Sequence, residues 1–228
     1  MVEDNGAVRR ASAGRPRDEQ IDAAVIAATL EMLGAEGYAG VSLEGVARRA
    51  GTSRPAIYRR WAGRAPLVLA ALARHLDVPT PPDTGCTLCD VDESFQVFLG
   101  AYTTIRPEDL SALYADCAHD ADWRSAYLAT IIEPARCAVA TTIDRAIARG
   151  DLREDIDREL VLDLVASLVH YRAMFGPNHL SESQAGEAIQ VLLQGAAADY
   201  DALVQRSEEI EREQLRTVGG EHVHGTHA

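Results

Sequence analysis

Apolar residues recur through most of the chain at intervals of three and four positions, the spacing of an α-helix. The first such segment begins at Asp18, and its predicted buried face carries Ile21, Val25, Ala28 and Met32. Gly37 is expected to end this helix, with Tyr38 packing back over its end. The pattern therefore predicts a regular helix near the N-terminus of the chain.

Two short helices are predicted next. Ser42 is the expected N-cap of the first, which lasts barely two turns. Ser53 is expected to cap the second, which spans residues 54–61 and turns Ile57 and Trp61 inward. Two short helices joined by Gly-Thr-Ser, the second of them basic, are typical of a helix-turn-helix.

A stretch with three prolines, DVPTPPDTGC, interrupts the helical pattern after a fourth predicted helix that ends near Leu76. Beyond it the periodicity predicts helices over residues 91–105, 108–119, 122–149 with a kink at Pro134, 157–175 and 182–205. The expected organisation is all-α, with a disordered basic arm at 1–17, a helix-turn-helix domain at 18–76, a linker at 77–90, a helical domain at 91–205 and a flexible tail at 206–228.

The amino-acid composition agrees with a helical protein that has a substantial hydrophobic core. The chain has 228 residues, of which 47% are hydrophobic and only 5% aromatic, a balance that favours helices over sheets. The first 25 residues lack the apolar stretch of a signal peptide, and no uninterrupted apolar run reaches about 18 residues. We therefore expect a soluble, cytoplasmic protein.

Charge is distributed unevenly along the chain, whose formal net charge is −13. Residues 1–76 hold 11 Arg against 8 Asp and Glu, whereas residues 77–228 hold 11 Arg against 27 acidic residues. The segment TSRPAIYRRWAGR, residues 52–64, has four arginines and no acidic residue. This asymmetry indicates an N-terminal part that faces a polyanion and an acidic body behind it.

The run VSLEGVARRAGTSRPAIYRRWAGRAPLVLAAL, residues 41–72, resembles the DNA-binding domain of the tetracycline-repressor (TetR) family. The residues that carry the resemblance are Ala50, Gly51, Ser53, Tyr58, Trp61 and Arg64. Arg64 stands where the family usually has Lys, while Pro55 and Ala56 stand where Gly and Thr are common. The resemblance implies an N-terminal three-helix DNA-binding domain followed by a C-terminal helical domain for ligand binding and dimerisation.

The resemblance also implies which residues meet DNA. They are Ser42, Thr52, Ser53, Arg54, Pro55, Ala56, Tyr58, Arg59 and Arg64, with Arg64 holding a phosphate; Arg60 joins them because it is basic and predicted to be exposed. In the arm, Arg15 and Arg17 have the composition of a minor-groove insert, although solvated disordered charge is an equal alternative. The identities of residues 54–56 do not indicate which DNA bases the protein prefers.

A protein that reads DNA with one helix gains affinity as a symmetric dimer on a palindromic site. The resemblance implies a homodimer built by the last two long helices, whose predicted interface is Leu164, Leu168, Tyr171, Ile189, Leu192, Leu193, Ala196 and Tyr200. The alternative is that these helices bury their apolar faces inside their own subunit. For a small-molecule effector the candidate contacts are Phe95, Phe98, Tyr102, Tyr114, Trp123, Tyr127, His170 and Met174, although each by itself fits a core residue better than a ligand contact.

The resemblance implies a transcriptional regulator, by default a repressor, that a small molecule releases from its DNA; other functions remain as alternatives. Cys86 and Cys89 form a C-x2-C that could bind zinc, with Cys117 or Cys137 and a histidine, or act as a redox pair that a regulator senses. A carrier of small molecules without DNA activity is a further alternative. We find no recognised catalytic motif and expect neither an enzyme nor a cofactor.

Overall fold

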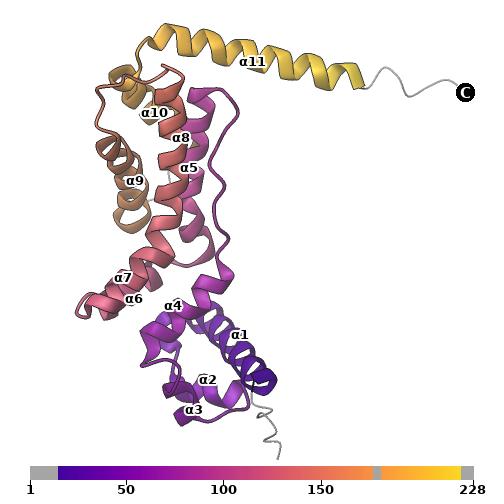
Figure 1. Ribbon diagram of the computed structural model, residues 1–228, viewed down its shortest axis with the longest axis vertical. Helices are drawn as coiled ribbons and strands as arrows, with labels where there is room; N and C mark the ends of the chain where they lie inside the picture. The colour runs from indigo at the N-terminus through magenta and orange to yellow at the C-terminus, as the bar shows by residue number, and fades with distance from the viewer. Residues whose placement is uncertain (1–14, 177–180, 222–228) are drawn as a thin grey trace, which may run out of the picture. The chain divides into compact units, whose positions relative to one another are not determined.

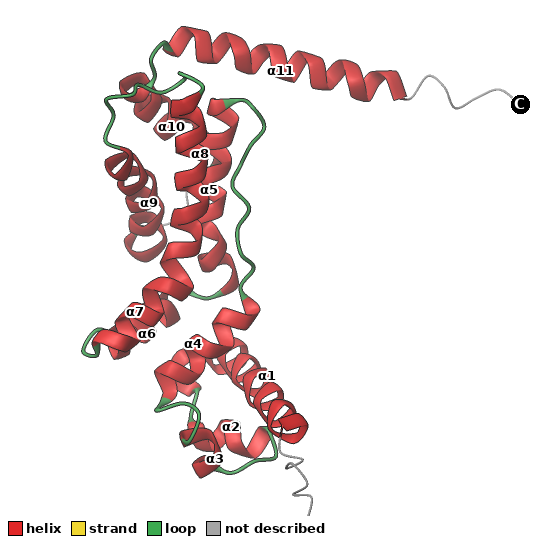
Figure 2. Ribbon diagram, in the orientation of Figure 1, coloured by secondary structure: helices red, strands yellow, loops and turns green. Residues whose placement is uncertain are grey.

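The computed structural model describes residues 15–176 and 181–221, and within these ranges the regular elements are helices (Figures 1 and 2). The predicted all-α fold is confirmed. None of these helices is both long enough and apolar enough to cross a membrane. In chain order they are α1 (Arg15–Gly40), α2 (Leu43–Arg49), α3 (Arg54–Tyr58), α4 (Arg64–His75), α5 (Thr87–Thr104), α6 (Pro107–Cys117), α7 (Ala121–Tyr127), the π-helix η1 (Leu128–Ile132), α8 (Glu133–Ala148), α9 (Arg158–Phe175), α10 (Glu182–Ala196) and α11 (Tyr200–Glu221).

The chain folds into two units. Of the described residues, the first contains 15–75 together with 112–126, and the second contains 76–111, 127–176 and 181–221. The division falls inside α6, so the second half of that helix and most of α7 belong to the first unit. This differs from the prediction, which places residues 112–126 in the C-terminal helical domain, because helical periodicity alone does not show which neighbours a helix packs against.

The first unit is built around α1, against which α2 and α4 pack. Gly37 has φ 72°, a conformation that non-glycine residues rarely adopt, and it interrupts α1 as predicted while Tyr38 behind it is buried. Gly45 lets α2 approach α1 closely, since a Cβ on it would lie 2.8 Å from the methyl carbon of Met32. The Met32 side chain of α1 therefore packs directly on the α2 backbone at Gly45.

The predicted helix-turn-helix caps are confirmed. Ser42 accepts a hydrogen bond from the Gly45 amide over 3.1 Å, and Ser53 caps α3. Gly51, at φ 62°, provides the left-handed turn between the two helices. The third helix ends at Tyr58 and is shorter than the predicted residues 54–61; beyond its end the Arg60 amide donates to the Ile57 carbonyl three residues back.

The second unit has its core where α5 meets α8, α9 and α10 (Figure 1). Phe95, Phe98, Val139, Ile143, Val165 and Leu193 are among its buried members. At the position of the predicted kink the helix changes type: the π-helical turn η1 comes directly before α8, and Pro134 lies in the first turn of α8. Proline lacks an N–H, and its ring crowds the carbonyl four residues earlier, so an ordinary helix could not continue unchanged through this position.

Three predicted boundaries are wrong. Residues 15–17 form the first turn of α1 rather than part of the arm, a position where Pro16 is tolerated; residues 1–14 lie outside the described residues. The linker ends at Cys86 instead of residue 90, because Cys86 caps α5. The helix expected over residues 182–205 breaks at Ala197, where the backbone pairs with Leu152 in an isolated bridge.

The chain is also helical beyond the predicted start of the tail at residue 206, since α11 continues to Glu221. Asp199 starts this helix by accepting a hydrogen bond from the Ala202 amide over 3.1 Å. Leu203 is buried at the beginning of α11, which packs against α5. A capping aspartate followed by apolar residues was the available sequence signal. The histidines 222, 224 and 227 lie outside the described residues.

Candidate nucleic-acid interface

The short helix α3 buries one side chain and exposes most of the others. Ile57 is 1% exposed, and it anchors the helix in the first unit. On the remaining surface Ser53, Arg54, Pro55, Tyr58 and Arg59 are exposed, while Thr52, Ala56 and Trp61 are partly buried. A helix fixed by one apolar anchor thus presents basic and polar groups to the surroundings.

Arg54 and Tyr58 form a pair on this surface. The guanidinium of Arg54 donates a hydrogen bond to the Tyr58 hydroxyl over 3.2 Å and lies 5.2 Å from the centre of its ring. Tyr58 is 44% exposed. The contact joins residues one helical turn apart, and it holds a cation and a phenol together at the exposed surface of α3.

The two neighbouring arginines differ in what they contact. Arg60 makes a 2.5 Å ion pair with Asp22 of α1 and donates to the Ala56 carbonyl over 3.1 Å. The side chain of Arg59 is exposed and makes no hydrogen bond or ion pair with another of the described residues. Arg60 therefore ties α3 to α1, whereas Arg59 remains available to an external anion.

Arg64, at the start of α4, is engaged within the first unit. It donates to the Asp116 carboxylate over 2.7 Å, and its guanidinium lies 4.3 Å from the centre of the Tyr38 ring. The Tyr38 hydroxyl donates to the same carboxylate oxygen over 2.6 Å. These two donors lower the pKa of Asp116, the Tyr38 hydrogen bond contributing most, and burial raises the pKa of Tyr38.

The remaining predicted DNA contacts lie at or just before the first turns of helices. Ser42 is exposed before α2, and Ser53 before α3; each hydroxyl oxygen accepts a hydrogen bond from its own helix, so its hydrogen is left to donate elsewhere. Thr52 is held in the turn by its amide, which donates to the Ala47 carbonyl over 3.0 Å. Arg15 and Arg17 lie in the first turn of α1.

The candidate effector contacts do not form one cluster. Phe95 and Phe98 are buried members of the core of the second unit. Tyr114 and Trp123 belong to the first unit, where Trp123 lies close to Gly63. Tyr127 is buried, and its hydroxyl donates to the Leu110 carbonyl over 3.4 Å. The sequence pattern alone does not tell a core aromatic residue from a ligand contact, because an aromatic side chain suits either place.

Tyr102 and His170 form a polar pair in the second unit. The Tyr102 hydroxyl lies 2.5 Å from Nδ1 of His170, and the two rings meet edge to face with their centres 5.4 Å apart. Burial raises the pKa of Tyr102 to about 12 and lowers the pKa of His170. Both groups are therefore neutral near pH 7. One turn further along α9, Met174 accepts a hydrogen bond from Ser111 over 3.5 Å.

An apolar face lies along α9 and α10. It borders a groove of about 730 Å³ whose lining includes Leu160, Leu164, Leu168, Val191 and Leu192. Leu164 is 51% exposed, and Tyr171 and Phe175 are exposed further along α9. Of the predicted interface residues, Ile189, Leu193 and Ala196 are instead buried in the core of their own subunit. On α10, the exposed Val191 lies on the opposite face from the buried Ile189 and Leu193.

Two acidic partners were not identified from sequence: Asp116, which binds Arg64, and Asp22, which binds Arg60. Arg64 and Asp116 are 52 positions apart. In the sequence each carboxylate is one acidic residue among several on a predicted helix, where it looks like an ordinary solvated position. Val191 was missed for a similar reason, because one exposed valine does not stand out from the pattern of α10.

A capped helix-turn-helix with a basic, exposed second helix defines a DNA-binding protein. Residues 25–71 match the family described as "Bacterial regulatory proteins, tetR family", and residues 81–192 match "Tetracyclin repressor-like, C-terminal domain". The chain belongs to the TetR family and is a DNA-binding transcriptional regulator.

Similar proteins cover most of the chain. It is 25% identical to the HTH-type transcriptional regulator YdeS of Bacillus subtilis over 186 residues, which are 81% of this chain and 94% of YdeS. It is 29% identical to the DNA-binding transcriptional repressor TetR of Mycobacteroides abscessus over 163 residues, 70% of this chain and 85% of that protein. Among solved structures, the TetR family transcription regulator SCO0332 is 26% identical, with a TM-score of 0.60 over 77% of this chain and 98% of SCO0332.

Proposed function

We propose that two copies of this chain form a repressor that binds a palindromic operator and leaves it when a small molecule occupies the second unit. The observation that carries the proposal is the surface of α3, where Arg54, Tyr58 and Arg59 are exposed around the buried anchor Ile57. Repression, rather than activation, is supported by the similarity to the repressor TetR of Mycobacteroides abscessus.

In the proposed complex α3 enters the major groove. Arg59 is the proposed reader of a guanine, because its guanidinium is exposed and can donate two parallel hydrogen bonds to O6 and N7. Arg54 and Tyr58 are proposed to meet a phosphate as a pair, since they already bind one another. Ser42, Thr52 and Ser53 are proposed phosphate contacts that fix the orientation of the helix. Arg60 is withdrawn from this set because it binds Asp22.

The apolar face of α9 and α10 is the proposed dimer interface. Leu160, Leu164, Tyr171, Phe175 and Val191 leave apolar surface in contact with water, and covering it with the same face of a second copy would remove that cost. A two-fold axis between the copies would also present two α3 helices to the two halves of a palindrome. Compared with the interface predicted from the sequence, the buried Ile189, Leu193 and Ala196 are replaced by exposed residues of α9 and α10.

The effector is proposed to contact Tyr102, His170 and Met174. The first two are neutral, partly buried polar groups next to the apolar core, where Phe98 lies 6.2 Å from His170 between ring centres. Such surroundings suit a mostly apolar molecule that carries a hydrogen-bonding group. Phe95 and Tyr127 are proposed only as the walls behind this region, since both are buried.

The proposal is tested by selecting DNA sequences from a random library with the full chain. The expected product is an inverted repeat bound by a dimer, with half-sites on one face of the double helix. Arg59→Ala should lose the selected sequence preference. Arg212→Ala removes an equal charge from the exposed surface of α11 and serves as the matched control. Selection of unrelated sequences without symmetry would refute the proposed operator binding.

A further inference from the structure

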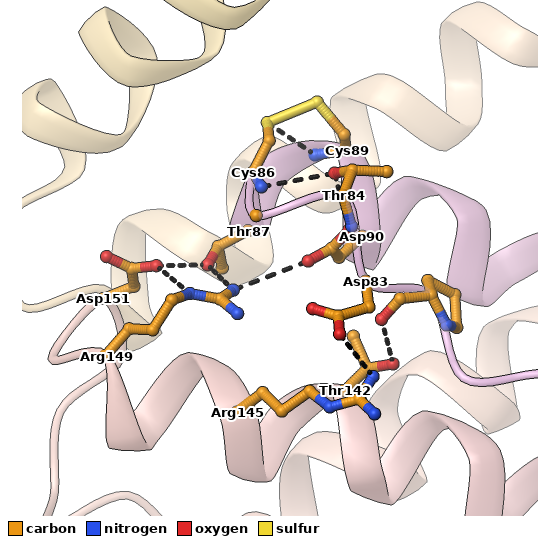
Figure 3. Close-up of polar contacts among 12 residues, drawn as sticks. Asp83, Thr84, Cys86, Thr87, Cys89, Asp90, Thr142, Arg145, Arg149 and Asp151 are labelled. Atoms are coloured by element: carbon orange, nitrogen blue, oxygen red, sulfur yellow. Dashed lines mark hydrogen bonds and ion pairs between the residues drawn. A yellow bond between two sulfur atoms is a disulfide. The ribbon is translucent and has the colours of Figure 1, made fainter.

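Cys86 and Cys89 are joined by a disulfide across the first turn of α5 (Figure 3). Their Cα atoms are 5.3 Å apart, a spacing that a disulfide spans without moving the backbone. Neither the proposed DNA contacts nor the proposed interface uses this pair. Because the two sulfur atoms are bonded to each other, they are not available as metal ligands in this state.

The two sulfur atoms differ in accessibility. Cys86 is 1% exposed, whereas Cys89 is only partly buried, with its sulfur 3.8 Å from the Ser207 hydroxyl of α11. Exchange of a disulfide requires an incoming thiolate to reach one sulfur while the other sulfur departs. Cys89 is therefore the sulfur that an external thiolate reaches, and Cys86 is the one that leaves.

The fold supports the departing sulfur. Cys86 is the N-cap of α5, and the Cys89 amide donates a hydrogen bond to Cys86 Sγ over 3.3 Å. Amide groups at a helix N-terminus carry partial positive charge, which stabilises a thiolate at this position. A better-stabilised thiolate is a better leaving group, so the local structure favours opening of the bond at this end.

Asp90 follows directly and would oppose a thiolate if its charge were unpaired. Its carboxylate accepts hydrogen bonds from the amide and the hydroxyl of Thr84, each over 2.7 Å, and lies 3.5 Å from Arg149 (Figure 3). Arg149 also donates to the Thr87 hydroxyl over 2.8 Å. The negative charge next to the cysteines is thus matched by donors that do not involve either sulfur.

These contacts also hold the turn before α5 without the disulfide. Thr142 donates to the Pro82 carbonyl over 2.9 Å, Arg145 pairs with Asp83 over 3.3 Å, and Arg206 donates to the Gly85 carbonyl over 3.3 Å. Because non-covalent contacts anchor the segment on both sides, the bond can open while the fold persists. This distinguishes the pair from a crosslink on which the fold depends.

We propose that Cys86 and Cys89 are a redox-active pair that exchanges two electrons with an external dithiol. A thiolate of the dithiol attacks Cys89 Sγ, the S–S bond breaks, and its electron pair leaves on Cys86. The second thiolate of the dithiol then attacks the mixed disulfide and releases Cys89. The protein disulfide is reduced to two thiols, the dithiol is oxidised to a disulfide, and the two protons pass from the dithiol to the cysteines. The proposal does not depend on the proposed function.

The test uses the full chain with Cys137→Ser, which removes the exposed free cysteine. The folded protein is equilibrated with mixtures of reduced and oxidised dithiothreitol, its thiols are trapped by alkylation, and the peptide containing both cysteines is quantified by mass spectrometry. We expect both residues to change together in one reversible transition, with the helical circular dichroism unchanged. Reduction that occurs only in denaturant, or no disulfide in the oxidised protein, would overturn the proposal.

The order of attack is tested with single-thiol variants and glutathione disulfide. Cys86→Ser leaves the accessible Cys89 and keeps a good N-cap residue, while Cys89→Ser leaves the buried Cys86. We expect Cys89 in the first variant to form a mixed disulfide at least about tenfold faster than Cys86 in the second. Equal rates, or a faster reaction of Cys86, would show that the exposure difference does not direct the exchange and would contradict the mechanism.

Discussion

Arg64, the predicted phosphate contact, is bound to Asp116 over 2.7 Å. Both side chains are more than one-third exposed, at 36% and 42%, so the pair is a screened one that contributes little to stability. Arg64 can therefore exchange the carboxylate for a DNA phosphate at a modest cost. The Tyr38 hydroxyl also donates to Asp116 over 2.6 Å, so the carboxylate would still have a donor after such an exchange.

Replacing Asp116 by Asn should strengthen DNA binding, because Arg64 no longer has to leave an anionic partner. We expect a gain of roughly two- to fivefold, the size of a surface ion pair. Arg64→Ala should weaken binding to all sequences alike and lower the salt dependence by about one charge. Fluorescence anisotropy over a salt series measures both effects. A loss of affinity in Asp116→Asn would mean that the carboxylate orients Arg64 for DNA.

Arg59 and Arg60 form a matched pair for testing α3. Arg59→Ala should cost about 1 to 3 kcal/mol of specific binding if this exposed guanidinium reads a guanine. Arg60→Ala should instead lower the free energy of unfolding, because it removes the ion pair to Asp22. Binding to specific and random DNA and urea denaturation separate the two outcomes. If Arg59→Ala weakens binding to all DNA sequences equally, Arg59 contacts a phosphate rather than a base.

Gly51 tests the turn between the two short helices. Gly51→Ala should lower the free energy of unfolding by about 1 kcal/mol, because φ 62° is unfavourable for a residue with a Cβ. Gly34→Ala is the control, since a Cβ there meets no atom within 4 Å and alanine favours a helix interior. The control should be neutral or stabilising in urea denaturation. Equal destabilisation of both variants would exclude backbone conformation as the cause.

The apolar face of α9 and α10 can be tested through the oligomeric state. Leu164→Glu should place a charge in the proposed interface and convert the dimer to a monomer in sedimentation velocity. Leu215→Glu on α11 changes another exposed leucine in the same way, and it should leave the dimer intact. A monomeric wild-type protein at micromolar concentration would remove the interface from the proposal.

The buried position of His170 predicts a pH dependence of stability. Its pKa is lowered by burial, so below the ordinary value of 6.5 the unfolded chain binds a proton that the folded chain does not. The free energy of unfolding should therefore fall as the pH decreases below about 6.5, and should be unaffected by this group above that value. His170→Gln should lose this contribution in urea denaturation between pH 8 and 5. If the free energy of unfolding depends on pH in the same way in the wild-type and His170→Gln proteins, the prediction is contradicted.

Local signals in the sequence were sufficient for the helix-turn-helix. Ser42, Gly51 and Ser53 act through bonds and backbone angles within a few residues, so their roles could be read from their own neighbourhood. The π-helical turn before Pro134 belongs to the same class, because its cause is the missing N–H of one residue.

Tertiary packing decided the rest, because it depends on residues far apart in the chain. It paired Arg64 with Asp116 and Arg60 with Asp22, placed Ile189 and Leu193 inside the subunit while Leu164 remained exposed, and ended α10 through the bridge between Leu152 and Ala197. Helical periodicity identifies an apolar face, but one apolar face can be covered by its own subunit or by another. Only the positions of the neighbouring helices distinguish these cases.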